Sequence, residues 1–174
     1  MNVRPLPLLL AISASLAIPA AQAATTGTLR FAGQVDAGTC NLAAGDENRT
    51  VTLPTVKISD FDSAVFTGAM NFEITAECES DIRNVIFLLT GTPSVDNGLL
   101  FANVGTSGGT ALWLRSGASG ATFPANGSPA DRSRTIATSG NKAVLPMWAA
   151  YHVTGKAITQ GTLDSTATVS ITYN

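Results

Sequence analysis

A strictly alternating segment, residues 71–78, constrains the fold of this chain more than any other feature of the sequence. Phe72, Ile74, Ala76 and Cys78 are small or apolar, and the residues between them are polar. Successive side chains of a β-strand point to opposite faces of a sheet, so this period of two predicts a strand with one buried face. The same pattern predicts that Cys78 points into the interior of the protein.

Similar signals recur at short intervals along the chain. Further strand candidates lie at 50–53, 56–58, 85–89, 99–101, 111–114, 143–153 and 162–174, and residues 118–141 read as loops and marginal strands. Pro54 interrupts the first pair, because proline lacks the backbone donor that a sheet requires. Many short strands separated by turn residues, without helical periodicity, predict an all-β antiparallel sandwich in a single domain.

The N-terminus has the pattern of a secretory signal peptide. Arg4 precedes an apolar run at 6–18, and small residues at 21–23 form a cleavage site of the A-x-A kind. The apolar run is short and has prolines at its edges, which argues against a membrane span. We therefore expect residues 1–23 to be removed and the mature chain to begin at Ala24 as an exported, soluble domain without a membrane span.

Charge argues against a nucleic-acid partner. The formal net charge is −2, and loss of Arg4 with the signal peptide changes it to −3. Nucleic-acid-binding domains carry a basic face, whereas the basic cluster here is two residues, Arg132 and Arg134, in a predicted loop. We expect no nucleic acid among the partners.

Export and an even number of cysteines predict a disulfide between Cys40 and Cys78. Closing this loop of about 38 residues contributes roughly 4 kcal/mol in the chain-entropy model. The alternative is two free thiols with a catalytic or metal-binding role. That alternative lacks a CxxC pair, and the single histidine, His152, does not complete a zinc site with two cysteines.

The remaining polar residues predict no catalytic or metal site and no cofactor. His152 is expected to face solvent or to be satisfied by a neighbour. The acidic pairs, Asp60 with Asp62 and Glu77 with Glu79, fit solvation of loops and strand ends, because no nucleophile motif or calcium-loop pattern accompanies them. The sequence therefore gives no support to an enzyme.

Residues 29–39 near the mature N-terminus also alternate. Leu29, Phe31, Val35 and Ala37 are apolar, and Gly33 interrupts their face. A strand glycine marks a place where another chain segment comes close, and a terminal strand is held only when it docks on a sheet. From the pattern alone this segment is the first strand of its own sandwich or a strand added to a neighbour's sheet.

Four sets of residues, taken in order and at their spacings, resemble a known family. They are Phe31, Gly33 and Val35 followed by Cys40; Cys78; residues 145–151 followed by Thr154 and Gly155; and Gly161 with the penultimate Tyr173. Gly33 lies seven residues before Cys40, and Gly161 is the fourteenth residue from the C-terminus. With these features the whole mature chain resembles the type 1 fimbrial (chaperone-usher) pilus subunits.

The resemblance implies an immunoglobulin-like sandwich that lacks its last strand and is completed by a donor strand from a neighbouring subunit. Residues 24–39 would be the donor-strand arm and 40–174 the pilin domain. The expected donor-strand residues are Leu29, Phe31, Gly33, Val35 and Ala37, and the expected chaperone and assembly residues are Gly161, Val169, Ile171 and Tyr173. Main-chain bonds and alternate side chains in pockets would hold the added strand.

The implied function is that of a structural, non-enzymatic pilus subunit that polymerises head to tail by donor-strand exchange and supports cell adhesion. The implied partners are other subunits, a periplasmic chaperone and an outer-membrane usher, on a route through the periplasm to a cell-surface fimbrium. A minor adaptor, a terminator and a receptor-binding tip subunit remain alternatives. Two residues depart from the family pattern: Pro54 replaces a common glycine and Arg115 a common aspartate.

Overall fold

The computed structural model describes residues 29–174, and the predicted signal peptide lies outside the described residues. The chain divides into two units, one ending at Val35 and the other comprising Asp36–Asn174. Residues 29–39 carry no regular secondary structure.

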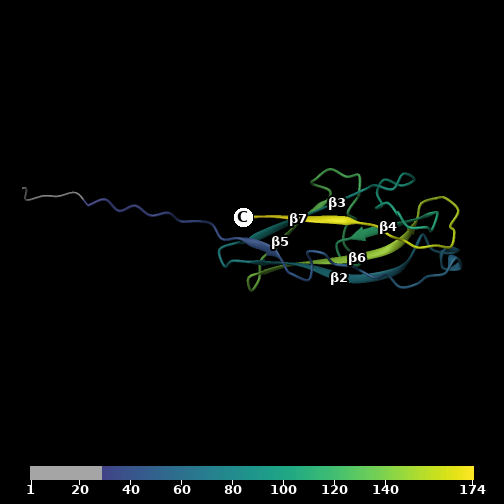
Figure 1. Ribbon diagram of the computed structural model, residues 1–174, viewed down its shortest axis with the longest axis horizontal. Helices are drawn as coiled ribbons and strands as arrows, with labels where there is room; N and C mark the ends of the chain where they lie inside the picture. The colour runs from purple at the N-terminus through teal and green to yellow at the C-terminus, as the bar shows by residue number, and fades with distance from the viewer. Residues whose placement is uncertain (1–28) are drawn as a thin grey trace, which may run out of the picture. The chain divides into compact units, whose positions relative to one another are not determined.

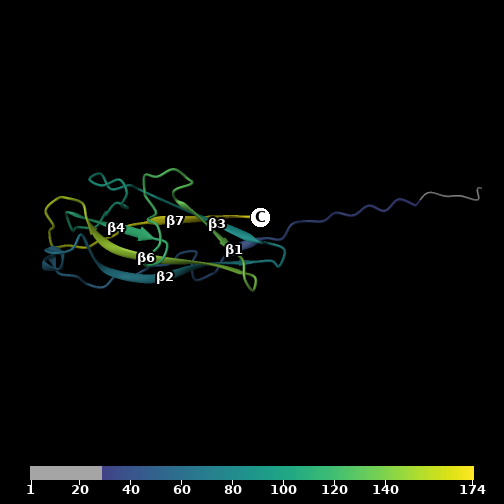
Figure 2. The same ribbon diagram turned by 180° about the vertical axis from the view of Figure 1, so that it is seen from behind.

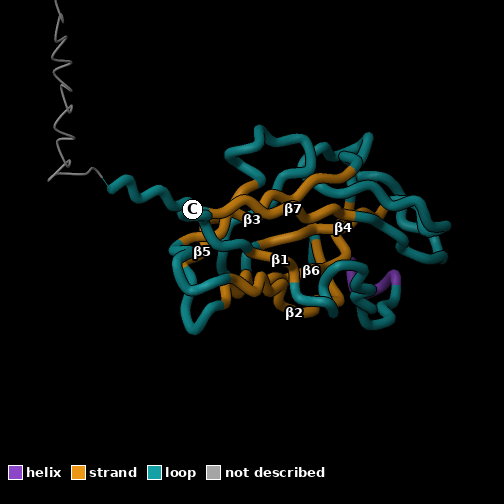
Figure 3. The backbone as a smooth tube through the Cα atoms, turned by 60° about the vertical axis from the view of Figure 1, so that its left-hand side comes forward, coloured by secondary structure: helices purple, strands orange, loops and turns teal. Residues whose placement is uncertain are grey.

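The second unit is built from strands and one short 3-10 helix. The elements are β1 (Cys40–Leu42), η1 (Ile58–Phe61), β2 (Phe66–Cys78), β3 (Asn84–Gly91), β4 (Thr110–Arg115), β5 (Ser133–Ala137), β6 (Lys142–Val153) and β7 (Ala167–Tyr173). η1 and the C-terminus lie at opposite ends of this unit (Figures 1 and 3). The predicted all-β fold is confirmed.

The strands form two antiparallel sheets that face each other. One sheet has the order β1-β2-β6-β4 and the other has the order β5-β3-β7. The longest pairing joins β2 to β6, with Ile74 opposite Leu145 and Ala76 opposite Ala143. β1 of the first sheet also approaches β7 of the second, and Figure 2 shows the two layers from behind.

The core lies between the sheets, and the face of β2 that the alternation predicted lies in it. Ile74, Ala76 and Cys78 of β2 are buried, and so are Val85, Phe87 and Leu89 of β3. The largest fully buried side chains are Phe87, Phe101, Phe123, Leu89, Leu145, Met147 and Val85. Burial of apolar area of this kind is the main force that stabilises a folded domain.

The predicted disulfide is present. Cys40 and Cys78 are bridged at an S–S distance of 2.05 Å and lie opposite each other where β1 pairs with β2. Both cysteines are buried in the hydrophobic core. The bridge therefore fastens the first strand of the domain to the end of its longest strand.

Three predicted strands differ from the structure. Residues 50–53 and 56–57 form no strand, and Ile58 begins η1 instead. Around 99–101, pairing is limited to isolated bridges from Phe101 to Pro93 and Leu112. These segments have the local residues of strands, but a strand forms only where a neighbouring backbone supplies hydrogen bonds, and Pro54 removes one donor.

The last strand is shorter than the sequence predicts. The alternating pattern begins at residue 162, whereas β7 begins at Ala167. The preceding residues bond to a distant loop rather than to β3, for example through Val104 N–H to the Asp164 carbonyl at 2.8 Å. Among residues 29–174, no helix is long and apolar enough to cross a membrane.

Candidate functional site

β7 leaves one side of its sheet open. It pairs with β3 along one edge, and within residues 36–174 no strand pairs with its other edge. An edge strand presents a row of backbone N–H and C=O groups that can accept a further strand. The open edge of β7 is therefore the starting point for the candidate site.

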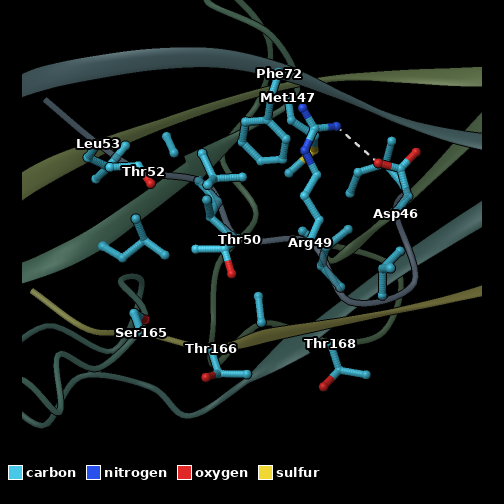
Figure 4. A pocket seen from close by; sticks show the side chains of 18 of the residues that line it. Asp46, Arg49, Thr50, Thr52, Leu53, Phe72, Met147, Ser165, Thr166 and Thr168 are labelled. Carbon is cyan, nitrogen blue, oxygen red and sulfur yellow. Dashed lines mark hydrogen bonds and ion pairs between the residues drawn. The ribbon is translucent and has the colours of Figure 1, made fainter. Parts of the chain in front are cut away.

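A groove of about 810 Å³ runs beside this open edge. One wall is made by residues 46–53 and the other by residues 163–169 (Figure 4). The floor between the walls is apolar and consists of Phe72, Ile74, Leu89, Leu112, Leu114, Met147, Ala149 and Tyr151. A groove with this lining fits an extended segment with apolar side chains at alternate positions.

The floor of the groove belongs to the core itself. Leu89, Leu114 and Met147 are members of the core cluster, and Leu53, Phe72 and other half-buried side chains pack against it. The groove thus opens directly onto the sandwich interior. An open apolar surface of this kind on a folded domain marks a site of association.

Asp46 and Arg49 fix the first wall to β2. The Asp46 carboxylate accepts a hydrogen bond from Thr75 N–H at 2.8 Å and pairs with the Arg49 guanidinium at 3.0 Å. Arg49 also donates to the Glu73 carbonyl at 2.7 Å and lies over the Phe72 ring. These side chains satisfy backbone groups on the edge of β2 where a strand would otherwise pair, which explains why the wall needs no regular strand.

We predict that Asp46→Ala destabilises the domain by about 1–3 kcal/mol, because Thr75 N–H loses its acceptor and Arg49 its ion partner. Urea unfolding of the variant and the parent chain measures the difference. Glu47→Ala is the matched control, since Glu47 is an exposed acidic neighbour. Equal loss of stability in both variants would contradict this role for Asp46.

The predicted assembly residues differ from one another in burial and in position. Val169 and Ile171 are half-buried and pack against the core, whereas Tyr173 is 39% exposed opposite Val85. Gly161 lies before β7 in a loop, where a Cβ atom would collide with the backbone of Thr106 and Ser107. Val169 therefore lies in the groove wall, while Gly161 serves a close contact between loops.

The predicted donor residues are exposed. Leu29, Phe31 and Val35 have exposed fractions of 82%, 92% and 98%. Nothing lies within 4 Å of the position that a Cβ atom on Gly33 would take. Ala37 is also exposed, and the next residue, Gly38, donates its N–H to the Asp81 carboxylate at 2.8 Å. Exposed large apolar side chains at alternate positions are unusual unless they have a partner.

Burial affects one ionisable side chain on the floor of the groove. Burial raises the pKa of the Tyr151 phenol on the groove floor, so this side chain stays neutral at physiological pH. The described residues contain no group of three His, Cys, Asp or Glu side chains that could hold a metal ion. The apolar floor and the unpaired edge of β7 offer apolar contact and backbone pairing.

Arg115, which departs from the family pattern, lies on the opposite face of β4 from the groove. Its guanidinium lies over the rings of Trp113 and Trp148, 5.1 and 5.4 Å from their centroids. Alternation along β4 places Leu112 and Leu114 in the groove floor and Arg115 on the outer face. The departure is thus accommodated by cation–π contacts away from the open edge.

Sequence reasoning missed Asp46, Arg49 and the loop contacts of the second wall. Asp46 lies in a polar stretch, residues 45–48, and nothing in the sequence shows that its carboxylate accepts a hydrogen bond from Thr75 N–H. Ser165 was also missed, although its hydroxyl oxygen is buried in the groove wall without a hydrogen-bond partner in the described part of the chain. These contacts join residues far apart in sequence, so local patterns carry no signal for them.

Comparison with known proteins identifies the family. Residues 29–174 match the family described as fimbrial protein. The chain is 32% identical over 166 residues to the minor fimbrial subunit HifD of Haemophilus influenzae, which covers 87% of this chain and 76% of that protein. It is 28% identical over 178 residues to the type-1 fimbrial protein A chain of Escherichia coli K12, covering 94% and 92%.

Solved structures share the fold. The P pilus rod subunit PapA matches with a TM-score of 0.63 at 18% identity, covering 78% of this chain and 99% of that one. A chaperone-usher pilus structure matches with a TM-score of 0.62 at 20% identity, covering 90% and 98%. The immunoglobulin-like sandwich and the family resemblance are confirmed: this chain belongs to the fimbrial protein family and is a structural subunit of a pilus.

Proposed function

We propose that this subunit polymerises by donor-strand exchange, in which residues 29–37 of one copy enter the groove of the next. The observation that carries the proposal is the apolar groove beside the unpaired edge of β7. A strand added there would gain main-chain hydrogen bonds from β7, and its alternate apolar side chains would cover the floor. The chain acts as a building block rather than an enzyme.

The exposed apolar residues of the arm support the same proposal. Leu29, Phe31 and Val35 occupy alternate positions that share one face of an extended segment, as an inserted strand requires. A second copy presents a groove with an apolar floor, so each copy carries both halves of the contact. Such a head-to-tail contact is heterologous and generates a filament rather than a closed dimer.

A periplasmic chaperone would cover the open edge before assembly, and an outer-membrane usher would be the place of exchange on the route to the cell-surface fimbrium. An uncovered edge strand beside an apolar groove favours aggregation and proteolysis. A chaperone strand that pairs with this edge would prevent both. In the assembled fimbria the subunit would support cell adhesion as part of the shaft or of a minor component.

The direct test offers the chaperone-bound chain a labelled synthetic peptide of residues 29–39. The peptide is expected to displace the chaperone and to remain bound through gel filtration. A matched peptide with Phe31 and Val35 replaced by serine should not bind, because it lacks the apolar side chains that would cover the floor. Failure of the natural peptide to bind, or equal binding of both peptides, contradicts donor-strand exchange.

Tyr173→Ala is expected to lower the periplasmic amount of the chain several-fold and to weaken chaperone capture, because the end of the open edge strand loses a large side chain. Truncation after Ile171 should have a larger effect, since it also removes the pairing of Tyr173 with Val85. Immunoblots and chaperone pull-downs measure both quantities. Thr172→Ala is the control on the other face, and equal levels in all variants would contradict the prediction.

The similarity to the minor fimbrial subunit HifD favours a minor component as the second candidate. Electron microscopy of cells that lack this chain separates the two. Complete loss of filaments indicates the main shaft subunit. Filaments that lack tips or change in length indicate an adaptor, terminator or tip subunit.

A further inference from the structure

Asn103 is the centre of a polar contact that joins two loops far apart in sequence. It lies half-buried between β3 and β4, and its partners include residues that precede β7. Asn103 does not line the groove, whereas residues 163–166 do. Asn103 can therefore affect the groove by holding its wall in place, and it does not itself contact a strand bound in the groove.

The Asn103 amide uses all of its hydrogen-bonding capacity. Its Oδ1 accepts from Gly105 N–H at 2.8 Å and from Asp164 N–H at 2.9 Å. Its Nδ2 donates to the Ser107 carbonyl at 2.9 Å and to the Thr162 carbonyl at 3.3 Å. Two donors facing Oδ1 and two carbonyls facing Nδ2 fix the orientation of the amide, and the side chain binds both loops at once.

Other contacts in the same place depend on this close approach. Thr106 and Thr162 exchange hydrogen bonds, with each backbone N–H donating to the other's hydroxyl at 3.1 and 2.9 Å. Gly105 and Gly161 have no room for a Cβ atom against the facing loop. A glycine in each loop therefore allows the backbones to lie at the distance that the Asn103 amide spans.

The groove wall that this contact holds contains a buried polar atom without a hydrogen-bond partner in the described residues. Residues 163–166 precede β7 and lie outside any strand, yet they form one side of the groove (Figure 4). The Ser165 hydroxyl is buried there without a hydrogen-bond partner in the described residues. A buried polar atom without a partner costs free energy, so a free wall would rotate to satisfy it.

We propose that Asn103 is a positioning residue that holds the 163–166 wall in the conformation that receives the donor strand. The inference rests on the proposed function of the groove. Without the amide, the wall populates other conformations, including collapse onto the apolar floor. Only the fraction of molecules with the wall in place binds the incoming strand, and the apparent affinity falls by that fraction.

The test compares Asn103→Ala with the parent chain, each purified in its chaperone complex, using the labelled peptide of residues 29–39. We expect about tenfold slower or weaker peptide capture and faster hydrogen exchange at the Asp164 amide. Asn97→Ala is the matched control, since Asn97 Oδ1 accepts a bond within its own turn, from Leu99 N–H at 3.2 Å. The control should capture peptide at the parent rate.

Thermal unfolding separates positioning from general loss of stability. Peptide capture is compared at a temperature where both chains are folded. If Asn103 had a purely structural role, the variant would have a lower melting temperature but would capture the peptide like the parent chain. Thr106→Val removes the hydrogen bond from Thr162 N–H, directly before the wall, and should change capture in the same direction by a smaller factor. This variant decides the question if Asn103→Ala does not fold.

Unchanged peptide capture by a folded Asn103→Ala chain, or unchanged exchange at the Asp164 amide, overturns the proposal. Failure of the parent chain to capture the peptide is a different result, because it overturns donor-strand exchange itself. In that case the Asp164 exchange rate alone decides whether Asn103 holds the wall.

Discussion

A chain that lacks residues 24–35 is expected to fold and to bind its chaperone, yet to form no filaments. Leu29, Phe31 and Val35 are exposed and lie outside the core cluster of the domain. Burial of each in a neighbour contributes about 1.5–3 kcal/mol, or roughly 5–9 kcal/mol for the three before main-chain bonds. Circular dichroism and electron microscopy of the truncated and parent chains measure folding and assembly.

The opposite account predicts the opposite result. If the arm completed its own sandwich, loss of that much apolar burial would rival the stability of a typical domain, about 5–15 kcal/mol, and the truncated chain would unfold. Unfolding of the truncated chain, or normal filaments built from it, would therefore refute the donor role of the arm.

Gly33→Leu sharpens the same prediction with a single residue. In the free chain nothing lies within 4 Å of the added Cβ atom, so the monomer should tolerate the change. In a filament the leucine would enter a site that we expect to fit no side chain, and subunit joining should stop. Ala32→Leu adds the same side chain to the other face of the arm and should permit assembly.

Removal of the disulfide is the second large effect. Replacing Cys40 and Cys78 together by alanine should lower the free energy of unfolding by about 4 kcal/mol, because the unfolded chain gains the entropy of a loop of 38 residues. Alanine avoids the buried hydroxyl that serine would leave. Urea unfolding of the double variant and the parent chain measures the loss.

The same bridge can be tested in the natural chain. Alkylation of periplasmic protein without reduction, followed by mass spectrometry, should show no labelled cysteine. Two alkylated thiols in chain that still assembles, or equal stability of the double alanine variant, would contradict a structural role for the bridge.

Local alternation was enough to predict the buried face of β2 and the inward direction of Cys78, because side chains of a strand alternate between its two faces. The apolar run at 85–89 predicted the strand β3 but not which of its side chains are buried. Alternation was not enough at residues 50–53, where the same residue types lack a backbone partner and Asp46 and Arg49 serve the edge of β2 instead. A strand forms only beside a neighbouring strand, and the residues of a single segment do not show which segment that neighbour is.

The start of β7 shows the same limit. The alternating pattern extends back to residue 162, but Asn103 and the loop around it bind residues 162–164 and displace them from the sheet. That contact joins positions about sixty residues apart, so it leaves no local pattern. Gly161 was predicted by position from the C-terminus, and its physical reason became visible only as the close approach to Thr106 and Ser107.

The central claim is that the arm of one copy occupies the groove of another, and photo-cross-linking in mixed filaments tests it most directly. A photoreactive phenylalanine analogue replaces Phe31 in light chains, which are assembled together with isotopically heavy chains. The account predicts light-to-heavy cross-links from residue 31 to groove residues such as Leu53, Leu114 or Met147. Cross-links confined to single chains, or joined to residues outside the groove, would contradict it.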